Sequence, residues 1–255
     1  KKTVRILDKF CDQKLKPFID QKYQELADYT HAYKQKMVMD KEVIANKGIW
    51  TAKKRYILNV YNSEGVDYEE PKLKIMGIEA VKSSTPKACR EKIKEALKVI
   101  MTKDENALID FIDEFRKEFK NLPVEDIAYP RGVNGLMKYQ SKDTIYRKHT
   151  PIHVKGALLY NVNLRQNSTL LNKYQAIQEG DKIKFLHLRL PNKYQSTAIT
   201  FITKLPRELD FHSIIDYDIQ YEKSFIEPLK FITDKILWKI DKSYGTQATL
   251  EDFFV

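Results

Sequence analysis

The sequence lacks the features that identify several common classes of protein. No apolar run approaches the roughly 18 residues of a membrane-spanning helix, so integration into a membrane is not expected. The two cysteines, Cys11 and Cys89, lie far apart, and the five histidines are scattered. Neither residue type has the spacing of a disulfide framework or of a zinc site. No internal repeat or low-complexity tract is present. A functional site must therefore come from other residues.

Positive charge is what the sequence has in excess. Lys and Arg outnumber Asp and Glu by 45 to 35, which gives a formal net charge of +10. This excess favours a polyanionic partner, nucleic acid first and an anionic membrane surface second. Hydrophobic residues make up 42% of the 255 residues, so the chain can bury a core in one large domain or two small ones.

The N-terminal part has a helical pattern. Apolar residues recur at helical spacing over residues 3–36, and Pro17 is expected to kink this helix or to start a second one. Tyr23, Tyr29 and Tyr33 are expected as core or shoulder residues; the alternative is that they are platforms on which bases stack. No capping residue precedes the pattern, so the chain is expected to be a C-terminal piece of a larger fold.

The most informative stretch begins at Lys53. Lys53, Lys54 and Arg55 run directly into Tyr56 and a β-branched and aromatic run that is typical of a strand. With a turn expected at 62–65, the unit is predicted to be a β-hairpin with a cluster of positive charge at one end. A strand fixes where a lysine stem starts, so Lys-x-Tyr can hold an ammonium against the floor of a nucleic-acid groove. The alternative is a solvated loop, the usual state of a charge cluster.

The following segment is predicted to be mostly helical. Thr85 suits the N-cap and Pro86 the first position of a helix that runs to about Thr102. Asp104 suits the N-cap of the next helix. Residues 121–150 have no clear period and are predicted as a loop.

Strands and a further helix complete the pattern. Residues 183–188 alternate as a strand does, and 197–202 are expected as its neighbour. Residues 213–241 return to helical spacing, with Pro228 as a kink or a restart. The predicted fold class is α+β.

Five short motifs occur in order along the chain. They are Trp-Thr-Ala-Lys-Lys-Arg-Tyr at 50–56, Glu-Glu-Pro-Lys-Leu-Lys-Ile-Met-Gly at 69–77, Lys-Ser-Ser-Thr-Pro at 82–86, His-Val-Lys-Gly at 153–156 and Phe-Ile-Glu-Pro-Leu at 225–229. Together they resemble the C-terminal third of the replicative family B DNA polymerases of T-even-like bacteriophages. The resemblance covers essentially the whole chain. It implies the end of a palm at 1–77, a mostly helical thumb at 78–244 and a sliding-clamp-binding tail at 245–255.

The resemblance also implies positions that bind DNA. Lys54 and Tyr56 match the Lys-x-Tyr pair that touches the minor groove at the primer end, and Lys53 matches its phosphate-side neighbour. Glu227 stands where a basic residue is expected, so the sequence departs from the family there. The expected DNA-binding residues are Lys53, Lys54, Arg55, Tyr56, Lys74, Lys82, His153, Lys155 and Lys223.

Catalytic residues are not expected in this chain. In the family they lie in a Tyr-Gly-Asp-Thr-Asp-Ser turn and in an earlier palm strand, and neither is present here. Glu42 and Glu64 match accessory acidic residues outside the main metal-binding pair, although Glu64 also fits a plain turn carboxylate. Mg²⁺ is therefore expected mainly in a missing N-terminal part that carries the exonuclease, the fingers and the catalytic aspartates. The chain alone is expected to be inactive.

The C-terminal residues fit the pattern Q-x-x-L-x-x-F-F, with Gln247, Leu250, Phe253 and Phe254. One helical turn places the three apolar residues on a single face. The pattern resembles the sliding-clamp-binding peptide of replication proteins, with Gly245 as a hinge. The alternative is a tail that folds back onto its own domain.

The expected function is that of the C-terminal portion of a DNA-directed DNA polymerase in the cytoplasm of an infected bacterial cell. Its expected partners are primer–template DNA, the N-terminal polymerase part and a sliding clamp. One alternative is a non-catalytic DNA-binding adaptor that tethers a clamp. Another is a metal-dependent nuclease that uses Asp40, Glu42 and Glu64, the first two on one face of a strand predicted at 37–45. A nuclease would need these carboxylates within ~4 Å of shared metal ions.

Overall fold

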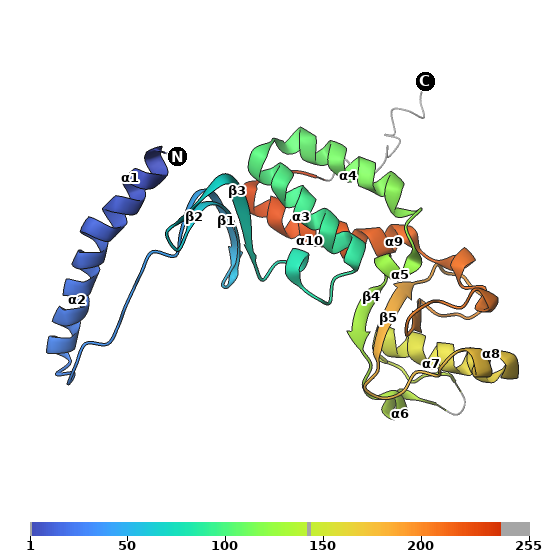
Figure 1. The fold of residues 1–255 in the computed structure, drawn as a ribbon. Helices are drawn as coiled ribbons and strands as arrows, with labels where there is room; N and C mark the ends of the chain where they lie inside the picture. Colours follow the sequence, from blue (N-terminus) through green and yellow to red (C-terminus); the bar gives the residue numbers. More distant parts are fainter. Residues whose placement is uncertain (1, 142–143, 241–255) are drawn as a thin grey trace, which may run out of the picture. The chain divides into compact units, whose positions relative to one another are not determined.

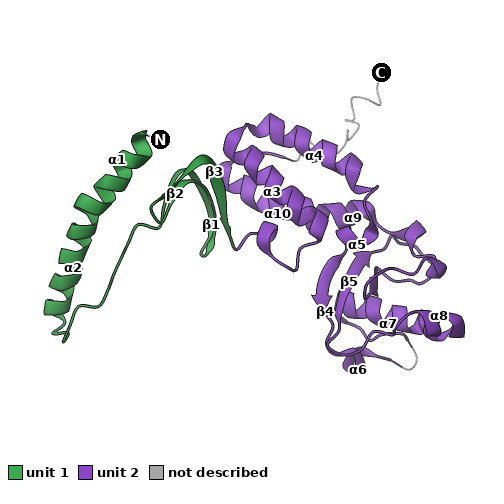
Figure 2. Cartoon of the chain, in the orientation of Figure 1, with its two compact units in different colours: residues 1–76 green, residues 77–255 purple. Residues whose placement is uncertain are grey.

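The computed structural model describes residues 2–141 and 144–240 (Figure 1). The chain forms two compact units, unit 1 (residues 1–76) and unit 2 (residues 77–255) (Figure 2). About 49% of the structure is helical and 20% is strand, which confirms the α+β class. In the described ranges no helix is long and apolar enough to cross a membrane. The boundary falls after Met76, and the palm and thumb identities of the two units stay a prediction.

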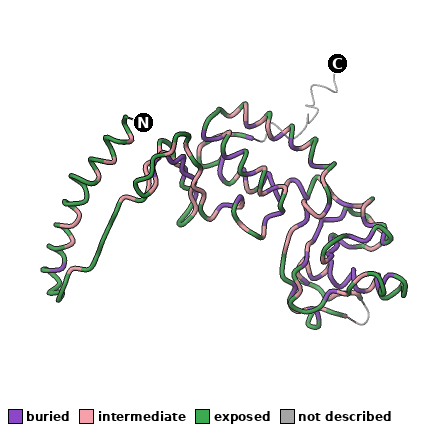
Figure 3. Tube along the Cα trace, in the orientation of Figure 1, coloured by how far each residue is buried: buried purple, intermediate pink, exposed green. Residues whose placement is uncertain are grey.

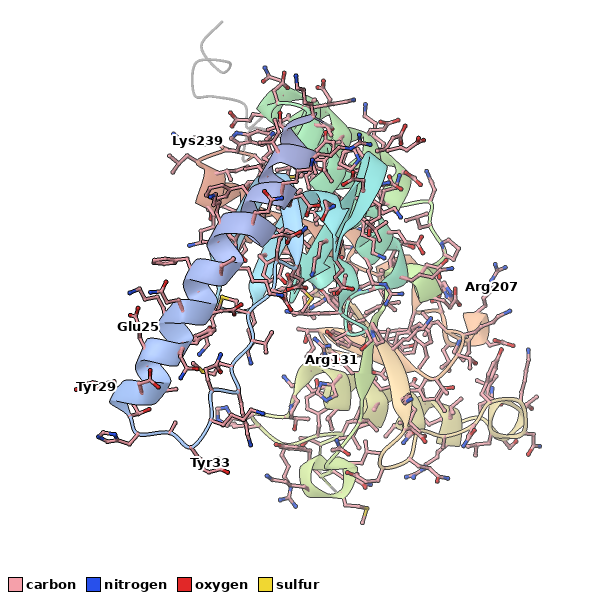
Figure 4. The ribbon with its side chains drawn as sticks, turned by 60° about the vertical axis from the view of Figure 1, so that its left-hand side comes forward. Glu25, Tyr29, Tyr33, Arg131, Arg207 and Lys239 are labelled. Carbon is pink, nitrogen blue, oxygen red and sulfur yellow. The ribbon has the colours of Figure 1, made fainter. Side chains whose placement is uncertain are left out.

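Unit 1 begins with one long helical segment. It consists of α1 (Lys2–Phe10), a π-helical turn (Cys11–Leu15) and α2 (Lys16–Tyr29). Pro17 lies in the first turn of α2, where a missing backbone N–H does little harm. The helix ends at Tyr29, seven residues earlier than predicted. Tyr29 and Tyr33 are 83% and 104% exposed, so the prediction that they are core or shoulder residues is wrong; Figure 4 shows both projecting outward.

The rest of unit 1 is an antiparallel sheet in the order β1-β2-β3. Its strands are β1 (Val43–Ala52), β2 (Arg55–Ser63) and β3 (Val66–Met76). Glu64 and Gly65 form the β2–β3 turn with φ of 50° and 83°, the sign that a tight hairpin requires at both central positions. The strand predicted at 37–45 starts only at Val43. The preceding residues instead pair with the helix, Asp40 with Lys16 and Lys41 with Asp8.

In unit 2, one group of helices packs around an aromatic core. The group contains α3 (Lys87–Thr102), α4 (Glu105–Phe119), α9 (Tyr217–Tyr221), a π-helical turn (Glu222–Ile226) and α10 (Glu227–Thr233). The rings of Phe115 and Phe225 lie edge to face with centroids 4.8 Å apart, a favourable geometry. The Asp104 cap is confirmed, because its side chain accepts a hydrogen bond from Ala107 N at 2.9 Å. Pro86, not Thr85, occupies the N-cap of α3.

The remaining part of unit 2 is a helix-covered antiparallel sheet in the order β4-β5-β6. Its strands β5 (Lys182–His187) and β6 (Ala198–Phe201) confirm the two strands predicted nearby. The segment predicted as loop instead contains α5 (Val124–Ile127), β4 (Tyr129–Gly132) and α6 (Leu136–Tyr139). Pro130 is tolerated in β4 because β4 is an edge strand. The other helices are α7 (Ile152–Arg165), α8 (Ser168–Lys173) and the 3-10 turns Glu79–Val81, Arg207–Leu209, His212–Ile214 and Asp234–Ile236.

Helix α7 approaches β6 so closely that only glycine fits at position 156. A Cβ at Gly156 would lie 2.8 Å from both the carbonyl carbon of Ile199 and the backbone nitrogen of Thr200. The Thr200 hydroxyl also donates a hydrogen bond to the His153 carbonyl oxygen at 2.9 Å, which holds this side of the contact in place.

We therefore expect Gly156→Ala to lower the free energy of unfolding by about 1–3 kcal/mol, because the helix must move off the sheet. Urea titration followed by circular dichroism measures the loss. Gly132→Ala is the matched control, since a Cβ there meets nothing within 4 Å, and it should leave the midpoint nearly unchanged. Equal midpoints for wild type and Gly156→Ala would contradict the close contact.

Candidate nucleic-acid interface

The predicted cation cluster forms the loop of a hairpin in unit 1. Ala52 pairs with Arg55, so Lys53 and Lys54 are the two loop residues between β1 and β2. Both are exposed, and Lys54 has a φ of 60°, a left-handed conformation that is uncommon for a residue with a side chain. The short loop between paired strands therefore fixes the point from which each lysine side chain extends.

Tyr56 belongs to a row of large side chains beside this loop. A register shift in β1 pairs Trp50 with Tyr56, and Tyr56 pairs with Met76 on β3. Directly opposed residues of antiparallel strands share a face, so the three side chains form one cross-strand row. Trp50 is 66% exposed and Met76 46% exposed. Trp50 was not predicted as a site residue, and the structure adds it to the candidate surface.

The two predicted accessory acids come together next to a predicted DNA-binding lysine. Glu64 N donates a hydrogen bond to the Glu42 carbonyl oxygen at 2.8 Å. Lys74 Nζ donates a hydrogen bond to the Glu42 carboxylate. The bond from Lys74 to Glu42 raises the pKa of Lys74. Lys74 is therefore matched with an acid in the free protein, which reduces the charge it offers to a phosphate.

The nuclease hypothesis needs Asp40, Glu42 and Glu64 to converge on metal ions. Instead, Asp40 pairs with Lys16 and Glu42 with Lys74. Across residues 2–141 and 144–240, no group of three or more His, Cys, Asp or Glu side chains could hold a metal ion. The described acids therefore give the nuclease hypothesis no geometric support.

A second candidate surface lies in unit 2, in what we call the basic segment, residues 127–178. Its sequence contains eight Lys and Arg but a single acidic residue, Asp143. The predicted residue Lys155 lies at the start of α7, with Nζ 5.5 Å from the ring centroid of Tyr146, a cation–π distance. Burial and then the charge of Arg131 lower the pKa of His153. This shift favours the neutral imidazole, which carries one hydrogen-bond donor and one acceptor.

Hydrogen bonds fix the start of α6 and the chain that follows it within the basic segment. The Glu179 carboxylate accepts from the backbone N–H groups that begin α6, including Leu136 N at 2.9 Å. Arg147 N donates to the Tyr139 carbonyl oxygen at 2.9 Å. Arg131 (labelled in Figure 4) and Arg147 belong to this candidate surface but were not predicted from the sequence. The excess of Lys and Arg over acidic residues in the basic segment was the signal that could have identified them.

The other predicted cations have mixed surroundings. Lys82 Nζ donates to Glu79 at 2.7 Å. Lys223 is exposed on the π-helical turn, and its charge, after the larger effect of burial, lowers the pKa of His187. Glu227 is exposed one turn further along.

The predicted tail residues lie outside the described part of the chain; they are Gln247, Leu250, Phe253 and Phe254.

A lysine loop beside the cross-strand row, and a segment with a large excess of Lys and Arg over acidic residues, are features typical of nucleic-acid-binding proteins. No family model matches the chain. Over 263 residues the chain is 37% identical to the DNA-directed DNA polymerase of Enterobacteria phage T4. Over 264 residues it is 38% identical to that of Escherichia phage RB69.

Each alignment covers 98% of this chain but 28% of the relative. The chain thus spans a little over a quarter of the length of the curated relatives it matches. The resemblance to T-even-like phage polymerases is confirmed, and the chain corresponds to a C-terminal portion of them.

Proposed function

We propose that the chain is the C-terminal portion of a DNA-directed DNA polymerase that grips the primer–template duplex and positions the primer end. The observation that carries this proposal is the match over 98% of the chain, which includes the hairpin loop with Lys53 and Lys54. Unit 1 would be the end of the palm and unit 2 the thumb. A complementary portion, in the same or another polypeptide, would carry the exonuclease, the fingers and the catalytic aspartates. Those aspartates would hold the Mg²⁺ ions that phosphoryl transfer requires.

Lys54 is proposed to read the geometry of the last base pairs. The minor-groove acceptors N3 and O2 occupy similar places in every correct base pair, so an ammonium there senses pair geometry and not sequence. A mismatch displaces an acceptor and leaves the buried donor poorly paired, at ~1–3 kcal/mol. Tyr56, held in β2, would brace the lysine stem and contact the primer backbone.

The basic segment is proposed to bind phosphates along the duplex. Lys155 adds charge at the start of α7, where the helix dipole also favours an anion. Arg131 and Arg147 extend the positive surface over β4 and the loop before α7. Contacts of this kind give affinity on all sequences alike and weaken as salt rises.

The C-terminal tail is proposed to dock a sliding clamp, so that the polymerase stays on its template. This part of the proposal rests on the sequence pattern Q-x-x-L-x-x-F-F alone. The proposed place of action is the cytoplasm of an infected bacterial cell.

Lys54→Ala in the complete polymerase is expected to weaken holding of the primer end on all sequences alike. It should also narrow the gap between extension rates from matched and mismatched primer ends. Lys53→Ala is the matched control, because Lys53 shares the loop but is assigned to the phosphate side. That variant should slow both ends by the same factor and reduce the salt slope by about one unit.

Primer extension from paired and mispaired ends across a salt series separates the two lysines. A matched-to-mismatched ratio unchanged by Lys54→Ala would rule out the groove-reading role. Lys54 would then be one more phosphate contact.

A further inference from the structure

Exposed apolar side chains are concentrated in unit 1. Of the 21 exposed large hydrophobic residues in the described chain, 14 lie in residues 1–76. Of the 47 buried hydrophobic residues, 5 lie there. Figure 3 shows the same contrast, with α1 and α2 almost entirely in the colours of exposed and half-buried residues. Unit 1 therefore has strands and a helix but very little core of its own.

The exposed large apolar side chains of the N-terminal helical segment lie on one face of α1, the π-helical turn and α2. The opposite side faces its own unit, through the pairing of Asp8 with Lys41, a contact of the Tyr23 hydroxyl with Met39 and the buried Ala27. The outer face carries seven large apolar side chains that are 44–83% exposed. We call this face the helix stripe; its residues are Ile6, Leu7, Phe10, Leu15, Phe18, Leu26 and Tyr29.

The π-helical turn makes the helix stripe continuous. Phe10 and Phe18 are eight residues apart, which in a regular α-helix would place them about 80° out of phase. A π turn accommodates one extra residue, and the turn at Cys11–Leu15 lies between them. The two phenylalanines then behave as if seven residues apart, within roughly 20° of one face. The stripe therefore runs the length of the helical segment, roughly 40 Å at 1.5 Å per residue.

The charge of the helix argues for a protein as the occupant of the stripe. Residues 2–29 contain six Lys or Arg and five Asp or Glu. This near balance is unlike the Lys- and Arg-rich polar face of a helix that lies on an anionic lipid surface. Large exposed apolar patches on soluble proteins mark interaction sites.

The comparisons with the two phage polymerases bear on which protein covers the helix stripe. Each alignment covers 98% of this chain and therefore includes most of the stripe, while nearly three quarters of each relative lies outside the 28% that is matched. We infer that the helix stripe is the surface on which the complementary polymerase portion docks and completes the core that unit 1 lacks. This inference rests on the proposed function and names its partner surface.

Site-specific crosslinking in phage-infected cells of the native host tests the inference. A benzophenone side chain replaces Phe10 or Phe18, and Leu190, which follows β5 and is 58% exposed, serves as the control position. Irradiation at positions 10 and 18 is expected to capture peptides that match the relatives outside the segment aligned with this chain. Position 190 should capture none of them. Capture of lipid, of a second copy or of residues 77–240 of this chain, or no capture at all, overturns the docking surface.

Variants with the captured portion then measure the contribution of the stripe. Phe10→Glu with Phe18→Glu should raise the concentration of that portion needed for half-maximal primer extension at least tenfold, with the maximal rate unchanged at saturation. Leu190→Glu should leave both values unchanged. An unchanged half-maximal concentration for the double variant overturns the inference. If the chain co-purifies with a polymerase portion while positions 10 and 18 capture nothing, the docking surface fails and the proposed function stands. Absence of any polymerase portion from both experiments overturns both.

Discussion

Purified alone, the chain is expected to bind a primer–template duplex and to incorporate no nucleotide, and addition of the complementary polymerase portion should restore synthesis. Phosphoryl transfer needs metal ions held by carboxylates, and the described residues contain no group of three or more His, Cys, Asp or Glu side chains that could hold one. The sequence also contains no Asp-Thr-Asp-Ser turn. Binding without synthesis is therefore the expected behaviour of the chain by itself.

Gel-based extension of a labelled primer with Mg²⁺ and all four deoxynucleotides measures the effect. A mock purification from cells without the chain controls for contaminating polymerase. Steady incorporation by the chain alone, above that control, would contradict the account. Binding with no rescue by any polymerase portion would instead favour the non-catalytic adaptor.

Deletion of residues 247–255 is expected to abolish clamp-dependent long products while short-primer extension stays intact. Burial of Leu250, Phe253 and Phe254 in a clamp pocket should contribute about 1.5–3 kcal/mol per side chain. Loss of all three would weaken the clamp complex by about a thousandfold or more, since each 1.4 kcal/mol is roughly tenfold in affinity.

Product length on a long primed template, with and without the sliding clamp, measures the loss. Alanine at the three apolar positions should reproduce the deletion. Glu251→Ala is the matched control, because Glu251 follows Leu250 and so lies off the apolar face of a helical turn. Unchanged long products after the deletion would show that the tail is not the tether and would favour a tail that folds back onto its own domain.

Local signals in the sequence predicted much of the fold. Asp104 was predictable as a helix cap because its short side chain can satisfy a free backbone N–H. The strand Lys182–His187 follows from its alternation. Strand β4 was not predictable, because Pro130 normally argues against a strand and its edge position depends on partners distant in sequence.

The candidate site was predictable only in part. Lys53, Lys54 and Tyr56 were predicted on one hairpin, but the position of Trp50 was not. A regular two-residue loop would pair Tyr56 with Thr51, and only the irregularity in β1 pairs it with Trp50. The exposure of Tyr29 was not predicted either, because it depends on which parts of the protein pack against the helix. Periodicity shows that a helix has an apolar face but not what covers that face.

The most direct test of the central claim is purification of the tagged chain from its native source during infection, followed by mass spectrometry and primer extension. We expect stoichiometric recovery, in the same or an associated polypeptide, of a polymerase segment that carries the catalytic aspartates, together with template-directed synthesis. Recovery of the chain with DNA or a sliding clamp but without such a segment, and without synthesis, would contradict its role as part of a DNA polymerase.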